Sequence, residues 1–332
     1  MLTLSATVLL CLLFSLHKEV GEAMGKQRLL PIRRLLCFLI VVHHIYREMP
    51  ESFSHVFFIY NNVGFWVVSM FFFFSGYGLL LSLRNKAGYL AHGFVKKKFL
   101  NILLPSLFVG LCYVAVYCLT GQFSLNRLFV LLKHGQCIPT SHWFIYVLFC
   151  QYVFFYLCFK SVKRFPMSLY TASTIGFVAT FYLLGYPSIW YKSTLFIVAG
   201  MLYCQYSVRS ADWKLSATML GAFVLLSILV GICKSDITIY KVLGNVAISA
   251  SVLCLFLAFS CRFTVDNRLL RFLGEYSMYI YLLHQPVLDV CRFLNGKDAM
   301  GSELVTIVIF AVSCLLAVIS SNTMKKVVPK VV

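Results

Sequence analysis

The sequence predicts an all-α membrane protein, a polytopic bundle of about ten transmembrane helices. Of its 332 residues, 61% are hydrophobic and 12% are charged, whereas soluble domains carry about a quarter charged residues. The mean hydropathy is +0.86. A helix needs about 20 mostly apolar residues to cross a bilayer core of roughly 30 Å. A chain of this length and composition therefore has room for many spanning helices and for little else.

Apolar runs separated by polar or basic loops give the positions of the predicted spans. Neither an internal repeat nor a soluble domain interrupts the series. The predicted spans are 33–47, 63–83, 99–120, 142–160, 168–185, 189–207, 214–233, 240–261, 275–293 and 302–323.

Most of the basic residues lie in the loops between the predicted spans. A net charge of +18 would suggest a nucleic-acid partner in a soluble protein, but here the Lys and Arg residues lie between the apolar runs. They gather in alternate loops, for example Arg84 with 96–98, while the next loop holds only Arg127 and Lys133. Because Lys and Arg accumulate in cytoplasmic loops, we expect a multi-pass protein of the cell's inner or plasma membrane. Both ends of the ten-helix body should then be cytoplasmic.

The first residues form a weaker, additional apolar segment. The run 2–16 has no basic residue before it and is short for a span. Cleavage as a signal peptide would place the next segment outside and conflict with the charge pattern. Two interpretations stay open, an extra span with its N-terminus outside or a true start at Met24. The expected division is an N-terminal segment 1–25, a transmembrane domain 26–324 and a basic cytoplasmic tail 325–332.

Ionisable residues inside a span are costly and usually functional, and the first span supplies the clearest pair. In RRLLCFLIVVHHIY, Arg33 and His44 are eleven positions apart. Three helical turns separate them, so they share one face and lie roughly 16 Å apart along the axis. A histidine can take a proton from a hydroxyl at neutral pH, which acyl transfer to an alcohol requires. A structural role for His44 is the alternative, and His43 points about 100° away and is interpreted as structural.

The second span ends in SMFFFFSGYGLLLS, where small residues permit close approach. Ser75 and Gly76 could admit another backbone or a ligand, although helix packing explains them equally well. The basic loop that follows contains Arg84, Lys97 and Lys98. By itself this loop is the usual cytoplasmic signature or a surface for anionic lipid, and it could also hold the phosphates of a nucleotide-bearing donor.

Two later spans also carry histidines. The fourth opens with SHWFIYVLF, which places His142 and Trp143 at the membrane interface. In the ninth, LGEYSMYIYLLHQPV, Tyr281 and His284 share one helix face. Pro286 will free backbone carbonyls that need partners. His284 is a candidate site residue, with a packing role as the alternative.

Taken together, these segments resemble acyltransferase family 3, membrane O-acyltransferases that modify cell-surface polysaccharides and related glycans. The resemblance covers about 26–323, and ten helices agree with it. Its motifs are the R-x10-H of Arg33 and His44, FFFFSGYGL at 71–79 with Ser75, Gly76 and Tyr77, the basic stretch into Pro105, SHWFIYVLF, and LGEYSMYIYLLHQP at 273–286.

The resemblance implies an O-acetyltransferase in which His44 is the catalytic base and Arg33 serves donor binding or site geometry. Acetyl-CoA would be the cytoplasmic donor substrate, with no tightly bound cofactor and no metal. Because Asn101 replaces a basic residue frequent in the family, Lys97 and Lys98 would carry more of the phosphate contact. The acceptor would be a hydroxyl of a cell-surface or lipid-linked glycan. Membrane lipid is an expected partner and nucleic acid is not; a homo-oligomer or a partner transferase stays open.

The main alternative is a membrane transporter or exporter of a glycan or lipid intermediate, without acyl-transfer chemistry. Such a protein should show broken helices at matching positions in two halves, and this sequence shows no such pairing. The other large class of membrane O-acyltransferases carries a His/Asn pair, whose central motif is missing here. A structural anchor would not require Arg33, His44 and His284 within spans.

Overall fold

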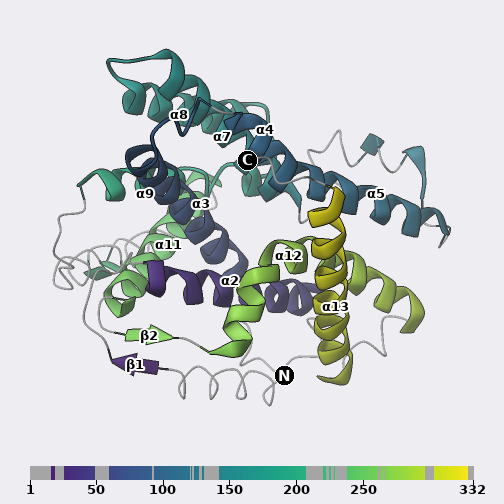
Figure 1. Cartoon of the computed structure of the whole chain (residues 1–332). Coiled ribbons are helices and arrows are strands. Elements are labelled where there is room, and N and C mark those ends of the chain that lie inside the picture. Colours follow the sequence, from purple (N-terminus) through teal and green to yellow (C-terminus); the bar gives the residue numbers. More distant parts are fainter. Residues whose placement is uncertain are drawn as a thin grey trace.

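The computed structural model consists mainly of helices (Figure 1). At the start of several helices, residues 26–34 among them, only the backbone is described. The structure describes residues 16–18, 26–48, 60–91, 93–119, 121, 123–126, 129–130, 142–206, 220–221, 224–225, 228, 238–260, 263–265, 267–295 and 303–327.

Every predicted span except one overlaps a described helix over most of its length. The exception, 214–233, lies largely outside the described residues. The helical elements are α2 (Lys26–Glu48), α3 (Tyr60–Asn85), α4 (Phe94–Lys98), the π-helix η3 (Phe99–Leu103), α5 (Leu104–Leu119), α7 (Trp143–Ser161), α8 (Pro166–Leu183), the 3₁₀-helix η5 (Ser188–Trp190), α9 (Phe196–Tyr206), α11 (Thr238–Ser260), α12 (Arg268–Asn295) and α13 (Glu303–Val327).

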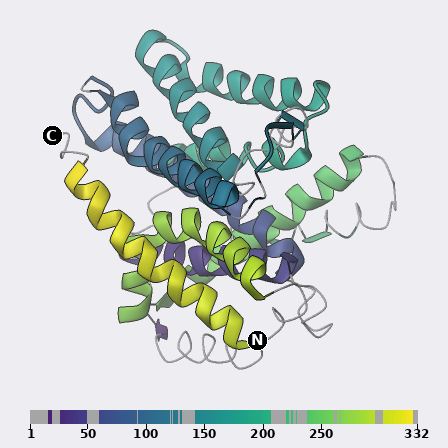
Figure 2. The same ribbon diagram turned by 90° about the vertical axis from the view of Figure 1, so that its right-hand side faces the viewer.

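The centre of the bundle is made by α2, α3, α9 and α12. Helix α3 packs against α9, α2 and α11, and α12 packs against α2 and α13. Phe72, Ile197 and Leu282, from three of these helices, are fully buried. Helix α13 lies on the outside of α12, and it faces the viewer in Figure 2. The first and ninth predicted spans thus lie side by side in the interior.

Two glycines bring α3 and α9 into backbone contact. A Cβ on Gly76 would lie 1.9 Å from the carbonyl oxygen of Ile197, and one on Gly200 would lie 1.9 Å from that of Phe73. Small residues at a crossing let helix backbones approach closely, as is common in membrane bundles. Helix α9 is also shorter than the predicted span 189–207, because the chain before Phe196 forms η5 and turns.

The segment from Phe94 to Leu119 is continuous but irregular. Pro105 has no backbone N–H and cannot make the usual helical bond to a preceding carbonyl. The helix widens before it into η3, where the Leu104 N–H donates to the Phe99 carbonyl. Such π segments often occur at functional sites. Here the π-helix η3 separates α4, which carries basic residues, from α5, which continues the apolar segment.

A short antiparallel sheet departs from the all-α prediction. Strand β1 (Leu16–Lys18) pairs with β2 (Phe263–Val265). Strands of three residues are too short to show a periodic pattern in the sequence. The prediction of an N-terminal apolar segment otherwise concerns residues outside the described part.

Length and hydropathy identify five described helices that could cross a membrane: 63–85, 94–119, 143–161, 242–260 and 307–324. Two shorter apolar helical stretches are 35–47 and 196–206. Large apolar side chains are exposed on the outside of the bundle, including Leu111 at 70% and Leu183 at 80%. Such surfaces suit lipid rather than water. The chain is therefore a membrane protein, and its total of ten spans stays a prediction.

Candidate active site

The first and ninth predicted spans bring two histidines together. His44 on α2 is half-buried and His284 on α12 is fully buried. Their ring centroids are 4.9 Å apart and their planes differ by 38°. Two helical turns earlier, the Cys37 thiol donates to the Ser277 carbonyl over 3.1 Å. His44 follows Cys37 by seven positions on α2, and His284 follows Ser277 by seven positions on α12. Equal steps in the same direction therefore connect the two contacts, so α2 and α12 run parallel.

His43 occupies a niche in α3. Its ring centroid is 5.1 Å from that of His44. A Cβ on Gly64 would lie 2.4 Å from two atoms of the His43 ring. The absence of a side chain at Gly64 therefore makes room for His43. This contact agrees with the structural interpretation of His43 and places the start of α3 beside the histidine pair.

The hydrogen bonding of His284 fixes which of its ring nitrogens carries the proton. Nδ1 lies 2.6 Å from the carbonyl oxygen of Tyr281. A carbonyl only accepts, so Nδ1 donates, and in the neutral ring Nε2 holds a lone pair. Nε2 is buried and has no hydrogen-bond partner in the described part of the chain.

His142 replaces a helical hydrogen bond that Pro286 cannot make in α12. Proline cannot bond the carbonyl four positions earlier, which is that of Leu282, and α12 continues through it. The Leu282 carbonyl accepts from Nε2 of His142 over 3.3 Å. Nδ1 of His142 then accepts from the Ser106 hydroxyl over 2.9 Å. This confirms that Pro286 frees a carbonyl that needs a partner, and it joins α12 to α5 and α7 beside His284.

Arg33 lies on α2 with His44, eleven residues earlier. The helix is continuous between them, so their backbone positions share one face about 16 Å apart along the axis. The side chain of Arg33 is outside the described residues, and its role in the site stays a prediction.

The glycine-containing motif at the end of the second predicted span contacts α9. Gly76 contacts the backbone of α9, as described above. Tyr77 has its ring centroid 6.2 Å from that of Tyr203 on α9. Ser75 is half-buried. Of the two interpretations of this motif, the structure gives Gly76 the packing one.

The two aromatic site candidates, Tyr281 and Trp143, differ in what they contact. Tyr281 lies with its ring centroid 5.8 Å from that of His284 and 5.9 Å from that of Phe144. Trp143, the first residue of α7, has its ring centroid 6.5 Å from that of Trp190. Tyr281 thus contacts the candidate site directly, whereas the described contacts of Trp143 join α7 to the turn before α9.

The basic candidates lie at the other end of α3. Arg84 donates to the Cys204 carbonyl over 2.9 Å and so caps the end of α9. The ammonium of Lys98 lies 4.3 Å from the ring centroid of Tyr152. Lys97 is half-buried. The predicted donor-binding residues are therefore close in sequence but make separate contacts.

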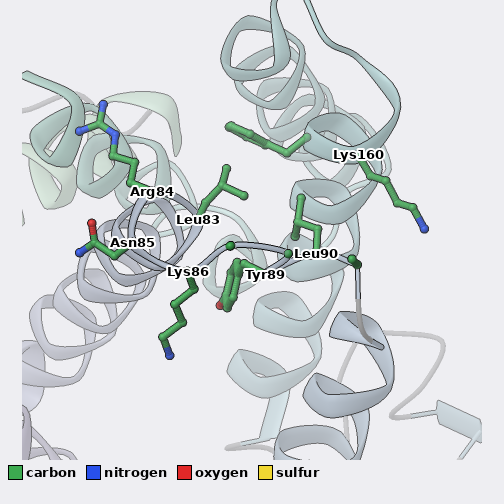
Figure 3. A pocket seen from close by; sticks show the side chains of 11 residues that line it. Leu83, Arg84, Asn85, Lys86, Tyr89, Leu90 and Lys160 are labelled. Atoms are coloured by element: carbon green, nitrogen blue, oxygen red, sulfur yellow. The ribbon is translucent and has the colours of Figure 1, made fainter.

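A pocket of about 510 Å³ opens at this basic end between α3 and α7. Leu83, Tyr89 and Phe159 are among its apolar lining residues, and Arg84, Lys86 and Lys160 also line it. In Figure 3 the side chains of Arg84, Lys86 and Lys160 point in three different directions. The pocket is thus lined by both apolar and cationic residues, and Lys97 and Lys98 are not part of its lining.

An acidic residue inside α12 was missed by the sequence analysis. The Tyr113 hydroxyl on α5 donates to Asp289, and the hydroxyls of Tyr113 and Tyr117 are 2.8 Å apart. Since Tyr113 gives its proton to Asp289, Tyr117 donates to Tyr113. An aspartate within the predicted span 275–293 was the available signal. It forms a further link between α5 and α12.

The histidine end and the basic end are far apart. Gly64 contacts His43, and Arg84 follows twenty residues later on the same helix, which corresponds to about 30 Å. This is about the thickness of the bilayer core. Among the described residues, no group of three or more His, Cys, Asp or Glu could hold a metal ion.

One comparison with known proteins identifies the family. A family model described as an acyltransferase domain, Acyl_transf_3, matches residues 32–322. Neither the curated proteins nor the solved structures contain a match. The matched region extends from α2 into α13 and contains the histidine pair and the basic end. The resemblance seen in the sequence is thereby confirmed, and the chain belongs to acyltransferase family 3.

Proposed function

We propose that this membrane acyltransferase is an O-acetyltransferase with His44 as its general base. The donor is cytoplasmic acetyl-CoA, and the acceptor is a hydroxyl of a cell-surface or lipid-linked glycan. The observation that carries the proposal is the pairing of His44 with His284 inside a chain of this family. A half-buried imidazole beside a fully buried one offers a basic nitrogen shielded from bulk water.

The reaction needs one proton transfer at the acceptor. A ring nitrogen of His44 takes the proton of the acceptor hydroxyl while the hydroxyl oxygen forms a bond to the acyl carbon. The bond between that carbon and the sulfur of CoA breaks, and the sulfur leaves as a thiolate. The thiolate takes a proton, ultimately the one held by His44. The products are the O-acyl glycan and free CoA, and the histidine is neutral again.

The basic end supplies the proposed donor site. Lys97, Lys98 and Arg84 lie near the ends of α4 and α3, where ammonium and guanidinium groups can contact the phosphates of CoA. Arg33, between the two ends on α2, is proposed to guide the acyl group toward His44. The 30 Å between the ends fits a donor and an acceptor that approach from opposite sides of the membrane.

The orientation follows from the basic loops. With both ends of the ten-helix body in the cytoplasm, the basic end faces the cytoplasm of the cell's plasma or inner membrane. The histidine end then faces the compartment in which surface glycans are assembled. A partner transferase or a second copy of the chain can complete the pathway, and surrounding lipid covers the apolar outer helices.

Mass spectrometry of surface glycans tests the proposal. Cells with the gene should carry glycans heavier by one acetyl group than cells without it. His44→Ala should abolish this difference at unchanged protein abundance in the membrane. The exposed Leu111→Val serves as the matched control and should retain acetylation. Unchanged glycans in cells that carry the intact protein would contradict the function, whereas full activity in His44→Ala would remove only the base assignment.

A further inference from the structure

The unsatisfied nitrogen of His284 is the strongest unexplained feature at the histidine end. His284 is fully buried, and its Nε2 has no partner in the described part of the chain. A buried polar atom without a hydrogen bond carries a desolvation cost that the fold does not compensate. Such a cost inside a family-3 site indicates a partner that is engaged during function. The ring of His44 lies beside it, with 4.9 Å between the two ring centroids.

We propose that His284 is a positioning residue, whose Nε2 lone pair accepts a hydrogen bond from a ring N–H of His44. This role rests on the proposed function. It fixes which nitrogen of His44 faces the acceptor hydroxyl. When His44 takes the proton of that hydroxyl, its other N–H stays bound to His284, which stabilises the imidazolium.

The ring geometry permits this bond. A hydrogen bond between two ring nitrogens needs about 2.9 Å between them. Each nitrogen lies about 1 Å from its ring centroid, so in-line imidazoles that share a hydrogen bond have centroids about 5 Å apart. The observed separation is 4.9 Å with a tilt of 38°. The separation of the two rings thus already matches that of a hydrogen-bonded pair.

The surroundings hold His284 in one orientation. Its Nδ1 proton is directed to the Tyr281 carbonyl, which leaves Nε2 as the nitrogen available to His44. One turn of α12 nearby is fixed by the bond from His142 to the Leu282 carbonyl. The parallel register of α2 and α12 is fixed by Cys37 and Ser277. The acceptor nitrogen is therefore preorganised, as the residue that orients a catalytic base must be.

A carboxylate is the usual residue in such a position, as in the aspartate of serine hydrolases. Of the two acidic residues of this helix, Glu275 precedes His284 by nine positions, and Asp289 follows it by five and is rotated about 140° around the helix. Asp289 accepts from Tyr113 instead. His284 thus occupies the orienting position with a neutral lone pair.

Two substitutions separate positioning from direct proton transfer and from packing. His284→Phe keeps an aromatic ring but removes both nitrogens. His284→Gln places an amide oxygen near the position of Nε2, which accepts a hydrogen bond but does not take up a proton. The exposed Phe293→Leu on the same helix is the matched control. Membranes from expressing cells, with their own glycan acceptors, are supplied with radiolabelled acetyl-CoA.

We expect His284→Phe to lower the maximal rate by about 100-fold with little change in the donor KM, as losses of residues that orient catalytic groups do. His284→Gln should recover at least about tenfold of that loss. A wild-type rate in His284→Phe would assign the ring to packing and overturn the inference. Equal inactivity of both variants at normal abundance would make His284 a proton carrier and overturn it too.

A spectroscopic measurement keeps the inference testable if the variants fold poorly. In protein labelled with ¹⁵N-histidine, the Nε2 resonance of His284 should be that of an unprotonated nitrogen, and His44→Phe should shift it. A protonated Nε2, or a resonance that His44→Phe leaves unchanged, would contradict the bond. A wild-type protein that transfers no label would instead contradict the proposed function itself.

Discussion

Near the start of α3 several polar residues are fully buried and bonded across helices, whereas near its end the basic residues are exposed or half-buried, and Arg84 and Lys98 make separate contacts. His284, His142 and Ser106 are fully buried at the histidine end. At the basic end, Arg84 caps α9 and Lys98 lies over Tyr152. Proton transfer needs groups held in fixed geometry, whereas phosphate contact by lysine depends mostly on charge. The two ends therefore differ in the way that the proposed base catalysis and the proposed donor binding require.

The largest effect should come from His142, which joins three helices at the histidine end. His142→Ala leaves the Leu282 carbonyl and the Ser106 hydroxyl without their partner and opens a cavity. We expect a loss of about 2–4 kcal/mol in the free energy of unfolding. Thermal unfolding of the detergent-purified protein measures it.

A double-mutant cycle with Pro286 sharpens this result. In Pro286→Ala the residue at 286 gains an N–H that can bond the Leu282 carbonyl within the helix. His142→Ala should then cost about 1–2 kcal/mol less in the Pro286→Ala background than in the native one. Additive effects would show that His142 does not serve the carbonyl that Pro286 frees.

A smaller effect is expected at the niche of His43. Gly64→Ala places a methyl group 2.4 Å from the His43 ring, which must move and disturb His44 beside it. We expect a destabilisation of about 1–3 kcal/mol and a reduced rate of acyl transfer. Gly78→Ala is the control, because a Cβ there meets open space.

Removal of the His43 ring tests the cause. In a His43→Ala background, Gly64→Ala should add little further destabilisation, since the crowded ring is gone. If the two effects add fully, the close contact between Gly64 and His43 is not what limits this position.

These contacts show which parts the sequence could predict. The helices and the pairing of Arg33 with His44 on one face follow from apolar runs and helical period, which are local. The meeting of His44 with His284 depends on the packing of two helices whose histidines are 240 residues apart. The sequence indicated each histidine as a separate candidate and did not predict that they meet. The bond from His142 to Leu282 combines a local rule, that Pro286 frees a carbonyl, with a partner that no local rule can name. The role of Gly64 could not be predicted from the sequence, because it depends on contact with the His43 ring of another helix.

At the basic end, Lys97 and Lys98 should differ although both are predicted to bind the donor. Lys98 is held over aromatic rings of α4 and α7, a contact worth about 0.5–1 kcal/mol. Lys97→Ala should therefore raise the acetyl-CoA KM several-fold, about the effect of one lost phosphate contact, with little change in stability. Lys98→Ala should lower stability as well.

The control for this pair is Lys96→Ala, at an exposed position of the same helix α4. It removes one positive charge and leaves the helix intact. The acetyl-CoA KM and the unfolding temperature are measured for all three variants. Three equal KM values, all unchanged from wild type, would show that this basic run serves topology alone.

The smallest effect is expected from Arg84, for which two roles compete. As a cap it donates to the Cys204 carbonyl at the end of α9, and a cation there stabilises the helix dipole by about 0.3–1 kcal/mol. Arg84→Gln should therefore lower the unfolding temperature slightly, whereas Lys86→Gln, on the rim of the same pocket, should not. If Arg84 also binds the donor, its substitution raises the acetyl-CoA KM in addition to this small loss of stability. A raised acetyl-CoA KM with unchanged stability would show that donor contact, and not capping of α9, is the main role of Arg84. The contact between Arg84 and the Cys204 carbonyl would then say little about how the basic end binds the donor.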